Sequence, residues 1–343
     1  MKRAKIRYRR IQYAVFLCLL LPSAYSCSSE EEHIVVLGEP VYFAASSSNG
    51  MTRGTTFDNM WTSDINISVC DKSTASNRIL LYHPNQEVTV SGQAVVLSPD
   101  AEANAFFWSP ISETRTFSAW YPYSSTEWTL PKEVTVPIDQ SSMTEANYKN
   151  LDLLYAPATT FQYKQKPALL TFYHQCCRIV VNINYVSIGG SIDEVTLGTD
   201  NLGLSANITT LGVTGNIGTG TATVWGNVSS TTSSVKMRKN TANSNDSEHY
   251  AVYECILPPQ SGGDYSTALI TIKGTRIVSG NNIQKSYIYR ESFDYRAGYQ
   301  YNYNFTLSKQ GALTIATVTV GNWGTVSFHS GDADVPDDTH NIE

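Results

Sequence analysis

Hydrophobic and polar residues alternate with a period of two along most of this chain, in short runs separated by Gly, Pro, Asn, Asp or Ser. Such runs are typical of half-buried β-strands, and helical periodicity is nearly absent. In the first part of the chain the pattern predicts strands at 65–70, 78–82, 93–97, 116–121, 133–137, 168–172, 178–183 and 194–197.

The pattern begins again after about residue 185. It predicts further strands at 206–210, 222–225, 249–257, 268–272, 284–289, 299–307, 313–320 and 325–328. One helical turn is expected at 145–150, before an ambiguous segment at 152–156. Short strands at this spacing favour an all-β fold with two tandem antiparallel β-sandwich domains. The polar run 227–246 is expected to protrude as a loop or hairpin tip, and the acidic tail 331–343 to be mobile.

The N-terminus has the features of a bacterial lipoprotein signal peptide. Six Lys and Arg residues precede an apolar run at 14–21 that is too short to span a bilayer, and small residues lead to Cys27. We therefore expect a signal peptide at 1–26 and acyl chains on Cys27, which would anchor the precursor in the outer membrane. The alternative is simple cleavage near Ser26.

An acidic stretch, a first strand and a basic residue follow Cys27. The stretch 28–32 is either a solvated tether or a sorting signal for the cell surface. Two short apolar runs contain Ile34, Val36, Val41 and Phe43, and a Ser-rich linker then carries Arg53 before Gly54. An exposed linker of this kind is where a trypsin-like protease cuts.

Charge and length limit the function further. Six of the 24 Lys and Arg residues lie in the signal peptide, so 18 face 30 acidic residues and the mature formal charge is about −12. Such a surface does not suit nucleic acids or anionic headgroups. The mature length suggests two domains, which we place at 54–165 and 166–343, after a lipidated segment at 27–53. A boundary between the two domains near Ser187 fits the strand pattern nearly as well as one at 165.

Four cysteines remain after Cys18 and Cys27, namely Cys70, Cys176, Cys177 and Cys255. Cys176 and Cys177 are neighbours in a predicted strand and point to opposite faces. We expect buried free thiols, although one bridge to Cys255 stays open. No zinc spacing, nucleotide loop or hydrolase motif occurs, so we expect no enzyme activity, no metal and no cofactor.

Several residues that could bind ligands are expected to be structural. His174 lies in an apolar strand, which favours a core or domain-interface histidine with satisfied hydrogen bonds over a ligand-binding one. Trp120, Tyr121 and Tyr123 could stack on sugars, but packing is the favoured interpretation. The Asp residues of the tail lack the spacing of a calcium loop.

A series of short motifs resembles the fimbrillin family, the pilins of type V pili in Bacteroidia. Phe117-Ser-Ala-Trp-Tyr-Pro-Tyr123 is similar to the F-x-A-[YW]-Y-P-Y element of that family. Elements elsewhere in the chain follow in the family's order, at 41–44, 52–53, 108, 136–140, 152–156, 170–174, 257–260, 298–301 and 318–323. The pair Cys176-Cys177 departs from the small or apolar residues of relatives.

The resemblance implies two transthyretin-like sandwiches and a structural pilin subunit of a cell-surface fimbria. In this family an arginine-specific protease removes the first strand from a lipoprotein precursor, and other pilin subunits fill the groove by donor-strand exchange. Here the cut would fall after Arg53, and the removed strand lies within 34–46. The donor strand comes from 313–328, with apolar candidates Leu313, Ile315, Val318, Val320 and Trp323.

Other roles stay open at this point. The alternative from a different class is a non-polymerising surface lipoprotein that binds glycans and keeps residues 27–53. Within the family, Arg53 argues against an anchor subunit, and the residues after Trp323 favour a stalk subunit. The polar run 227–246 would suit a tip adhesin with a host or bacterial ligand.

Overall fold

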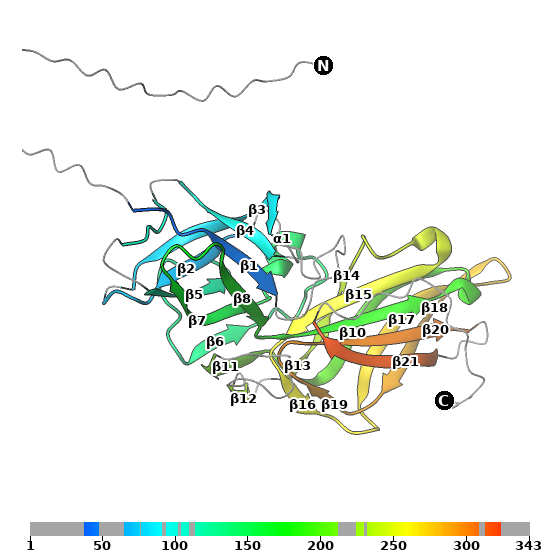
Figure 1. Cartoon of the computed structure of the whole chain (residues 1–343). Coiled ribbons are helices and arrows are strands. Elements are labelled where there is room, and N and C mark those ends of the chain that lie inside the picture. Colours follow the sequence, from blue (N-terminus) through cyan, green and yellow to red (C-terminus); the bar gives the residue numbers. More distant parts are fainter. Residues whose placement is uncertain are drawn as a thin grey trace, which may run out of the picture. The chain divides into compact units, whose positions relative to one another are not determined.

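The first strands of the chain close into a barrel (Figure 1). The computed structural model describes residues 38–47, 65–75, 77–90, 94–101, 104–109, 114–211, 224–229, 232–308 and 313–323, all within the compact unit Gly38–Glu343. The barrel order is β1 (Phe43–Ser47), β4 (Ala94–Pro99), β3 (Ile79–Val90), β2 (Ile67–Asp71), β5 (Thr114–Tyr121), β7 (Leu154–Gln162) and β8 (Ala168–His174). Strand β8 pairs with β1 in parallel and completes the circle, whereas the other barrel pairs are antiparallel.

Two larger sheets enclose a second core. One has the order β14 (Arg238–Lys239), β15 (Tyr250–Leu257), β9 (Cys177–Asn184), β20 (Tyr299–Leu307) and β21 (Leu313–Asn322). The other has the order β13 (Thr232–Lys236), β10 (Ser191–Gly203), β17 (Ala268–Val278) and β18 (Asn281–Arg290). The short pair β16 (Gln260–Gly262) and β19 (Phe293–Tyr295) contributes Phe293 and Tyr295 to the same core.

A three-stranded sheet joins the two halves. Strand β6 (Lys132–Thr135) follows the barrel strand β5 in sequence, yet it pairs with β11 (Ser205–Thr210), which also pairs with β12 (Val224–Val228). Helix α1 (Glu145–Lys149) follows β6 in the sequence. It begins after Thr144, whose hydroxyl accepts a hydrogen bond from the backbone N–H of Asn147. Two further helical turns among the described residues are η2 (Val186–Ile188) and η3 (Asp246–Glu248). Among the residues described above, no helix is long and apolar enough to cross a membrane.

The alternating pattern of the sequence explains the burial of the central strands. On β9, Ile179, Val181 and Ile183 face the core between the two larger sheets, and the opposite face is buried as well. Cys176 and Cys177 therefore point into different cores, as their adjacency predicted. The helical turn predicted at 145–150 is confirmed as α1, and the ambiguous segment 152–156 leads into β7.

The all-β prediction is confirmed, and three details differ from the sequence-based expectation. The N-terminal strands named above form a closed barrel in their hydrogen-bonding order, where the sequence predicted a sandwich. The change from barrel to second sheet falls between β8 and β9, whereas a boundary at 165 assigns β8 to the C-terminal half. The polar run 227–246 contains strands β13 and β14, because Val235 and Met237, at alternate positions, reach the core.

Candidate strand-exchange site

Strand β1 lies between two barrel strands and is hydrogen-bonded along both edges. Phe43 is opposite Leu97 of the antiparallel neighbour β4 and opposite Ala168 of the parallel neighbour β8. Ala45 is likewise opposite Val95 and Leu170. Strand β1 is thus the element that joins β4 to β8 and closes the barrel (Figure 1).

The side chain of Phe43 fills an aromatic pocket inside the barrel. It is fully buried, and its ring meets Tyr82, Phe106 and Phe117 edge-on, at centroid distances of 5.4, 6.2 and 4.8 Å. Edge-to-face pairs of this kind contribute about 0.5–1.5 kcal/mol each beyond burial of their area. Val41 and Ala45 are also buried in this core. Val41 and Phe43, which the sequence analysis assigned to the strand expected to be removed, therefore both point inward.

The segment before β1 is held by the stretch Phe106–Trp108. The backbone N–H of Val41 donates to Phe106 O at 2.8 Å, and that of Trp108 donates to Glu39 O at 2.8 Å. A Cβ atom on Gly38 would lie 1.9 Å from Trp108 O, so only glycine allows this approach.

Two lysines also contact this segment. Glu39 forms ion pairs with Lys164 and Lys166, and the Lys166 ammonium lies 4.6 Å from the centroid of the Tyr42 ring. Hydrogen bonding to Lys166 is the main reason that the pKa of Glu39 lies below its ordinary value. Segment 38–42 is therefore fixed by backbone and side-chain contacts.

Several predicted site residues lie outside the described residues. These are Cys27, Ile34, Val36, Arg53 and Gly54, together with the acidic tail. In the sequence Arg53 comes six residues after Ser47, the last residue of β1. The strand and the cleavage candidate are therefore close in sequence, with β1 on the N-terminal side of the cut.

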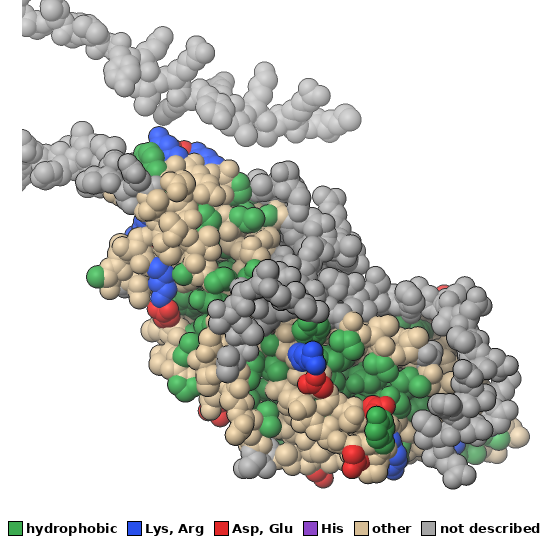
Figure 2. All heavy atoms as spheres, turned by 60° about the horizontal axis from the view of Figure 1, so that its bottom comes forward, with side chains coloured by type: hydrophobic (Ala, Val, Ile, Leu, Met, Phe, Trp, Pro, Cys, Tyr) green, Lys and Arg blue, Asp and Glu red, His purple; other side chains and the backbone are tan. Residues whose placement is uncertain are grey.

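Strand β21 lies at the end of its sheet, and its only partner among the described strands is β20. Leu313 and Ile315 are half-buried and pack on the second core. Val318 and Val320 are 43% and 55% exposed. Figure 2 brings the lower side of Figure 1, where β12, β16 and β19 are labelled, towards the viewer and shows hydrophobic side chains gathered between charged ones on that face.

Trp323 directly follows β21 and lies in a small apolar cluster that we call the junction core. Its members come from both halves of the chain, and they are Val134, Tyr148, Leu153, Cys176, Ile208, Ile256 and Trp323. The indole is fully buried and stacks on the His174 ring at a centroid distance of 4.3 Å. His174 Nδ1 lies 2.9 and 3.0 Å from the two carboxylate oxygens of Asp152. The prediction that His174 is a satisfied interface histidine is confirmed.

A comparison with protein families matches residues 52–323 to the fimbrillin-like family. This chain belongs to the fimbrillin-like family. The match covers the barrel strands after β1, both larger sheets and the junction core. The resemblance seen in the sequence is therefore confirmed.

Two solved structures share this fold, and a third is similar at a lower TM-score. A candidate cell adhesion protein of Bacteroides uniformis is 18% identical to the fimbrillin-like chain, with a TM-score of 0.54, covering 83% of this chain and 98% of its own. One from Bacteroides ovatus is 17% identical, with a TM-score of 0.53 and coverage of 83% and 98%. A fimbrial protein of Bacteroides vulgatus is 15% identical, with a TM-score of 0.43 and coverage of 83% and 100%. No curated protein sequence gives a significant match.

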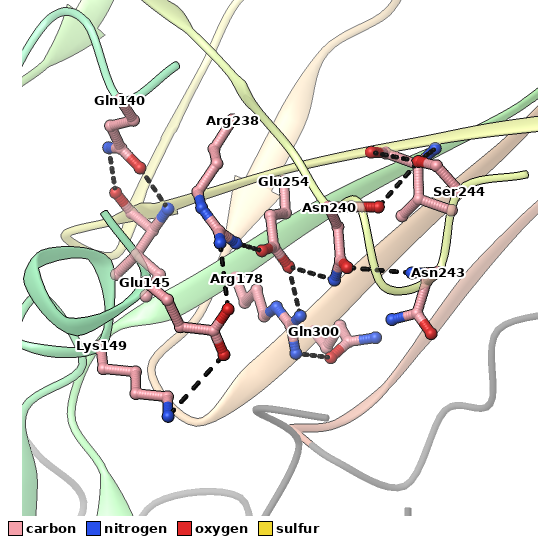
Figure 3. A network of polar contacts seen from close by, with 12 residues as sticks. Gln140, Glu145, Lys149, Arg178, Arg238, Asn240, Asn243, Ser244, Glu254 and Gln300 are labelled. Atoms are coloured by element: carbon pink, nitrogen blue, oxygen red, sulfur yellow. Dashed lines mark hydrogen bonds and ion pairs between the residues drawn. The ribbon is translucent and has the colours of Figure 1, made fainter. Parts of the chain in front are cut away.

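The fimbrillin-like protein also contains a buried polar network that the sequence did not reveal (Figure 3). Arg178 and Glu254 are fully buried on adjacent strands and form an ion pair. Arg238 donates to Glu254 at 2.6 Å and to Glu145 of α1 at 3.2 Å. Gln300 accepts a hydrogen bond from Arg178 at 3.3 Å. Arg238 belongs to the five-stranded sheet and Glu145 belongs to α1, so their ion pair connects α1 to that sheet.

The remaining candidate groups have structural surroundings. Cys70, Cys176, Cys177 and Cys255 are all free and buried, which answers the open question of a bridge. Trp120 and Tyr121 are buried, so the packing interpretation is confirmed for these two, whereas Tyr123 is exposed. Within the described ranges, no group of three His, Cys, Asp or Glu side chains could hold a metal ion.

Proposed function

We propose that this fimbrillin-like protein is a structural, non-catalytic subunit of a cell-surface fimbria that polymerises by donor-strand exchange. The precursor would reach the outer membrane as a lipoprotein acylated on Cys27. An arginine-specific protease would then cut between Arg53 and Gly54. The observation that carries the proposal is the place of β1, which closes the barrel and precedes the cut in sequence.

Cleavage after Arg53 would leave β1 held to the barrel only by non-covalent contacts. Its departure would expose the hydrogen-bonding edges of β4 and β8 and empty the pocket of Phe43. Each backbone hydrogen bond contributes about 0.5–1.5 kcal/mol net, and burial of a Phe side chain about 1.5–3 kcal/mol. A strand with alternating apolar residues from another subunit would restore both contributions.

Strand β21, together with Trp323 that follows it, is the best donor region that the described residues offer. The strand is already extended and lies at the end of its sheet, and the region carries Leu313, Ile315, Val318, Val320 and Trp323. Its exposed valines, Val318 and Val320, would enter the barrel of another subunit. The partners of this protein would be other pilin subunits, identical or different.

The test uses purified chain that begins at Ser28 and an arginine-specific protease. The new N-terminus is sequenced, and oligomers are followed on a gel without boiling. A terminus at Gly54 together with a boiling-sensitive ladder supports the proposal. Arg53→Lys, which keeps the charge but removes the arginine, should abolish both results.

Two outcomes contradict the proposal. The chain could stay uncut at Arg53, or it could be cut and remain strictly monomeric at every concentration. A carbohydrate array would then test the glycan-binding alternative. Arg78→Lys, at a position that follows the linker, serves as the matched control and should leave cleavage and ladder unchanged.

A further inference from the structure

A change of register divides β21, the last strand among the described residues, into two parts. Asn304 of β20 is opposite Thr317, but the next residue, Phe305, is opposite Ile315. One residue of β21 is therefore skipped, as in a β-bulge. We propose that β21 opens at this bulge, that its second part, 317–323, leaves as the donor, and that Trp323 is the latch that holds this part closed. The inference rests on the proposed function.

The first part of β21 is packed into the protein's own core. Leu313 is opposite Leu307, and Ile315 is opposite Phe305, both of which are fully or almost fully buried. Leu313 and Ile315 themselves are half-buried against that core. Removing them would expose apolar surface in the subunit that donates, so this part favours staying in place.

Apart from Trp323, the side chains described in the second part, at 317–320, are exposed. Val318 and Val320 are opposite Tyr303 and Tyr301, which are buried, yet the two valines are 43% and 55% exposed. Their departure would sacrifice little burial, and their insertion into the barrel of another subunit would bury them. The donor side chains that matter most are thus Val318 and Val320.

Trp323 is the side chain that resists this departure. Its indole is fully buried, and its backbone N–H donates to Gly298 O at 2.9 Å. Gly298 N–H in turn donates to Cys176 O at 2.8 Å, so the end of β21 is tied to the start of β9. The stack on His174 adds a contact with the last residue of β8.

The latch and the donor are separable by experiment. Hydrogen exchange is measured by mass spectrometry on the uncleaved chain that begins at Ser28, for wild type, Trp323→Ala and Val320→Thr. We expect Trp323→Ala to raise exchange about tenfold or more in peptides that cover 317–323. Peptides that cover β17 and β18 should be unchanged. Val320→Thr should leave monomer exchange unchanged.

The same variants are then cut at Arg53 and followed by the ladder assay. Trp323→Ala should form the ladder faster than wild type, and Val320→Thr should form a weaker one. Unchanged exchange at 317–323 in Trp323→Ala overturns the inference, as does loosening of the whole sandwich in both Trp323→Ala and the milder Trp323→Phe. If wild type never forms a ladder, the proposed function fails, while the exchange result still decides whether Trp323 is a latch.

Discussion

The ring of Phe43 meets the ring of Phe117 edge-on, with centroids 4.8 Å apart and an interplanar angle of 83°. Phe43 comes from the strand that closes the barrel, and Phe117 from β5. The contact lies in the pocket that a donor strand would have to refill.

Phe43→Ala should destabilise the uncleaved protein by about 3–5 kcal/mol, because it empties a fully buried aromatic site. Denaturant unfolding of the chain that begins at Ser28 measures this loss. The same variant should release its first strand more readily after cleavage at Arg53.

Tyr42→Ala is the control for that prediction, since the neighbouring side chain is 46% exposed. It should change the free energy of unfolding by less than about 1 kcal/mol. Equal losses in the two variants would show that Phe43 is not the anchor of β1.

The Arg178–Glu254 pair gives a second prediction. Both side chains are fully buried, so Glu254→Leu alone leaves a buried guanidinium without its carboxylate and should cost about 3–5 kcal/mol. The double variant Arg178→Met with Glu254→Leu should recover most of this loss. Urea unfolding measures the free energy of unfolding of each variant. A double variant as unstable as Glu254→Leu alone would refute the prediction that the two charges are costly only when one of them is unpaired.

The sequence predicted the fold through local alternation, and it failed where distant strands meet. The apolar positions of β9 and β20 could be read from their period of two. The parallel pairing of Phe43 with Ala168 could not be predicted from the sequence, because no local pattern specifies a partner so far along the chain.

The same distinction holds for the candidate site. Val41 and Phe43 were assigned to the first strand from their apolar runs and from the family resemblance, and the structure adds that both side chains are buried in the barrel core. The partners of His174 were not predicted, because Asp152 and Trp323 reach its ring from separate segments of the chain. Arg178 and Glu254 were missed although each charge interrupts an apolar strand, and that interruption is the signal that could have revealed them.

The four thiols should be protected in the native protein. Burial raises the pKa of Cys70, Cys176, Cys177 and Cys255, which lowers the thiolate fraction, and the surrounding side chains exclude reagents. In the chain that begins at Ser28, a disulfide reagent at pH 8 should therefore label almost no thiol within minutes, whereas unfolding in guanidinium should release all four.

Val320→Cys provides an internal standard for this measurement, because the position is 55% exposed. It should add one rapidly reacting thiol without altering the slow ones. Rapid labelling of the wild-type protein would mean that at least one of the four cysteines is accessible.

The ion pairs of Glu39 predict how pH affects the hold on β1. Hydrogen bonding to Lys166 lowers the pKa of Glu39 from its ordinary value of 4.5. A carboxyl whose pKa is lowered on folding stabilises the folded state above its unfolded pKa, and this contribution disappears as pH falls through the folded value. Because the side chains of Glu39 and Lys166 are substantially exposed to solvent, this pH-dependent stabilisation should be modest and should weaken with salt.

We expect release of the cleaved first strand to become faster below about pH 4.5 in wild type. Lys166→Met should release the strand faster at neutral pH and show a smaller change on acidification. The measurement is the rate at which the fragment ending at Arg53 dissociates, followed by size exclusion at several pH values. An identical pH profile in the two proteins would exclude Glu39 and Lys166 as the cause.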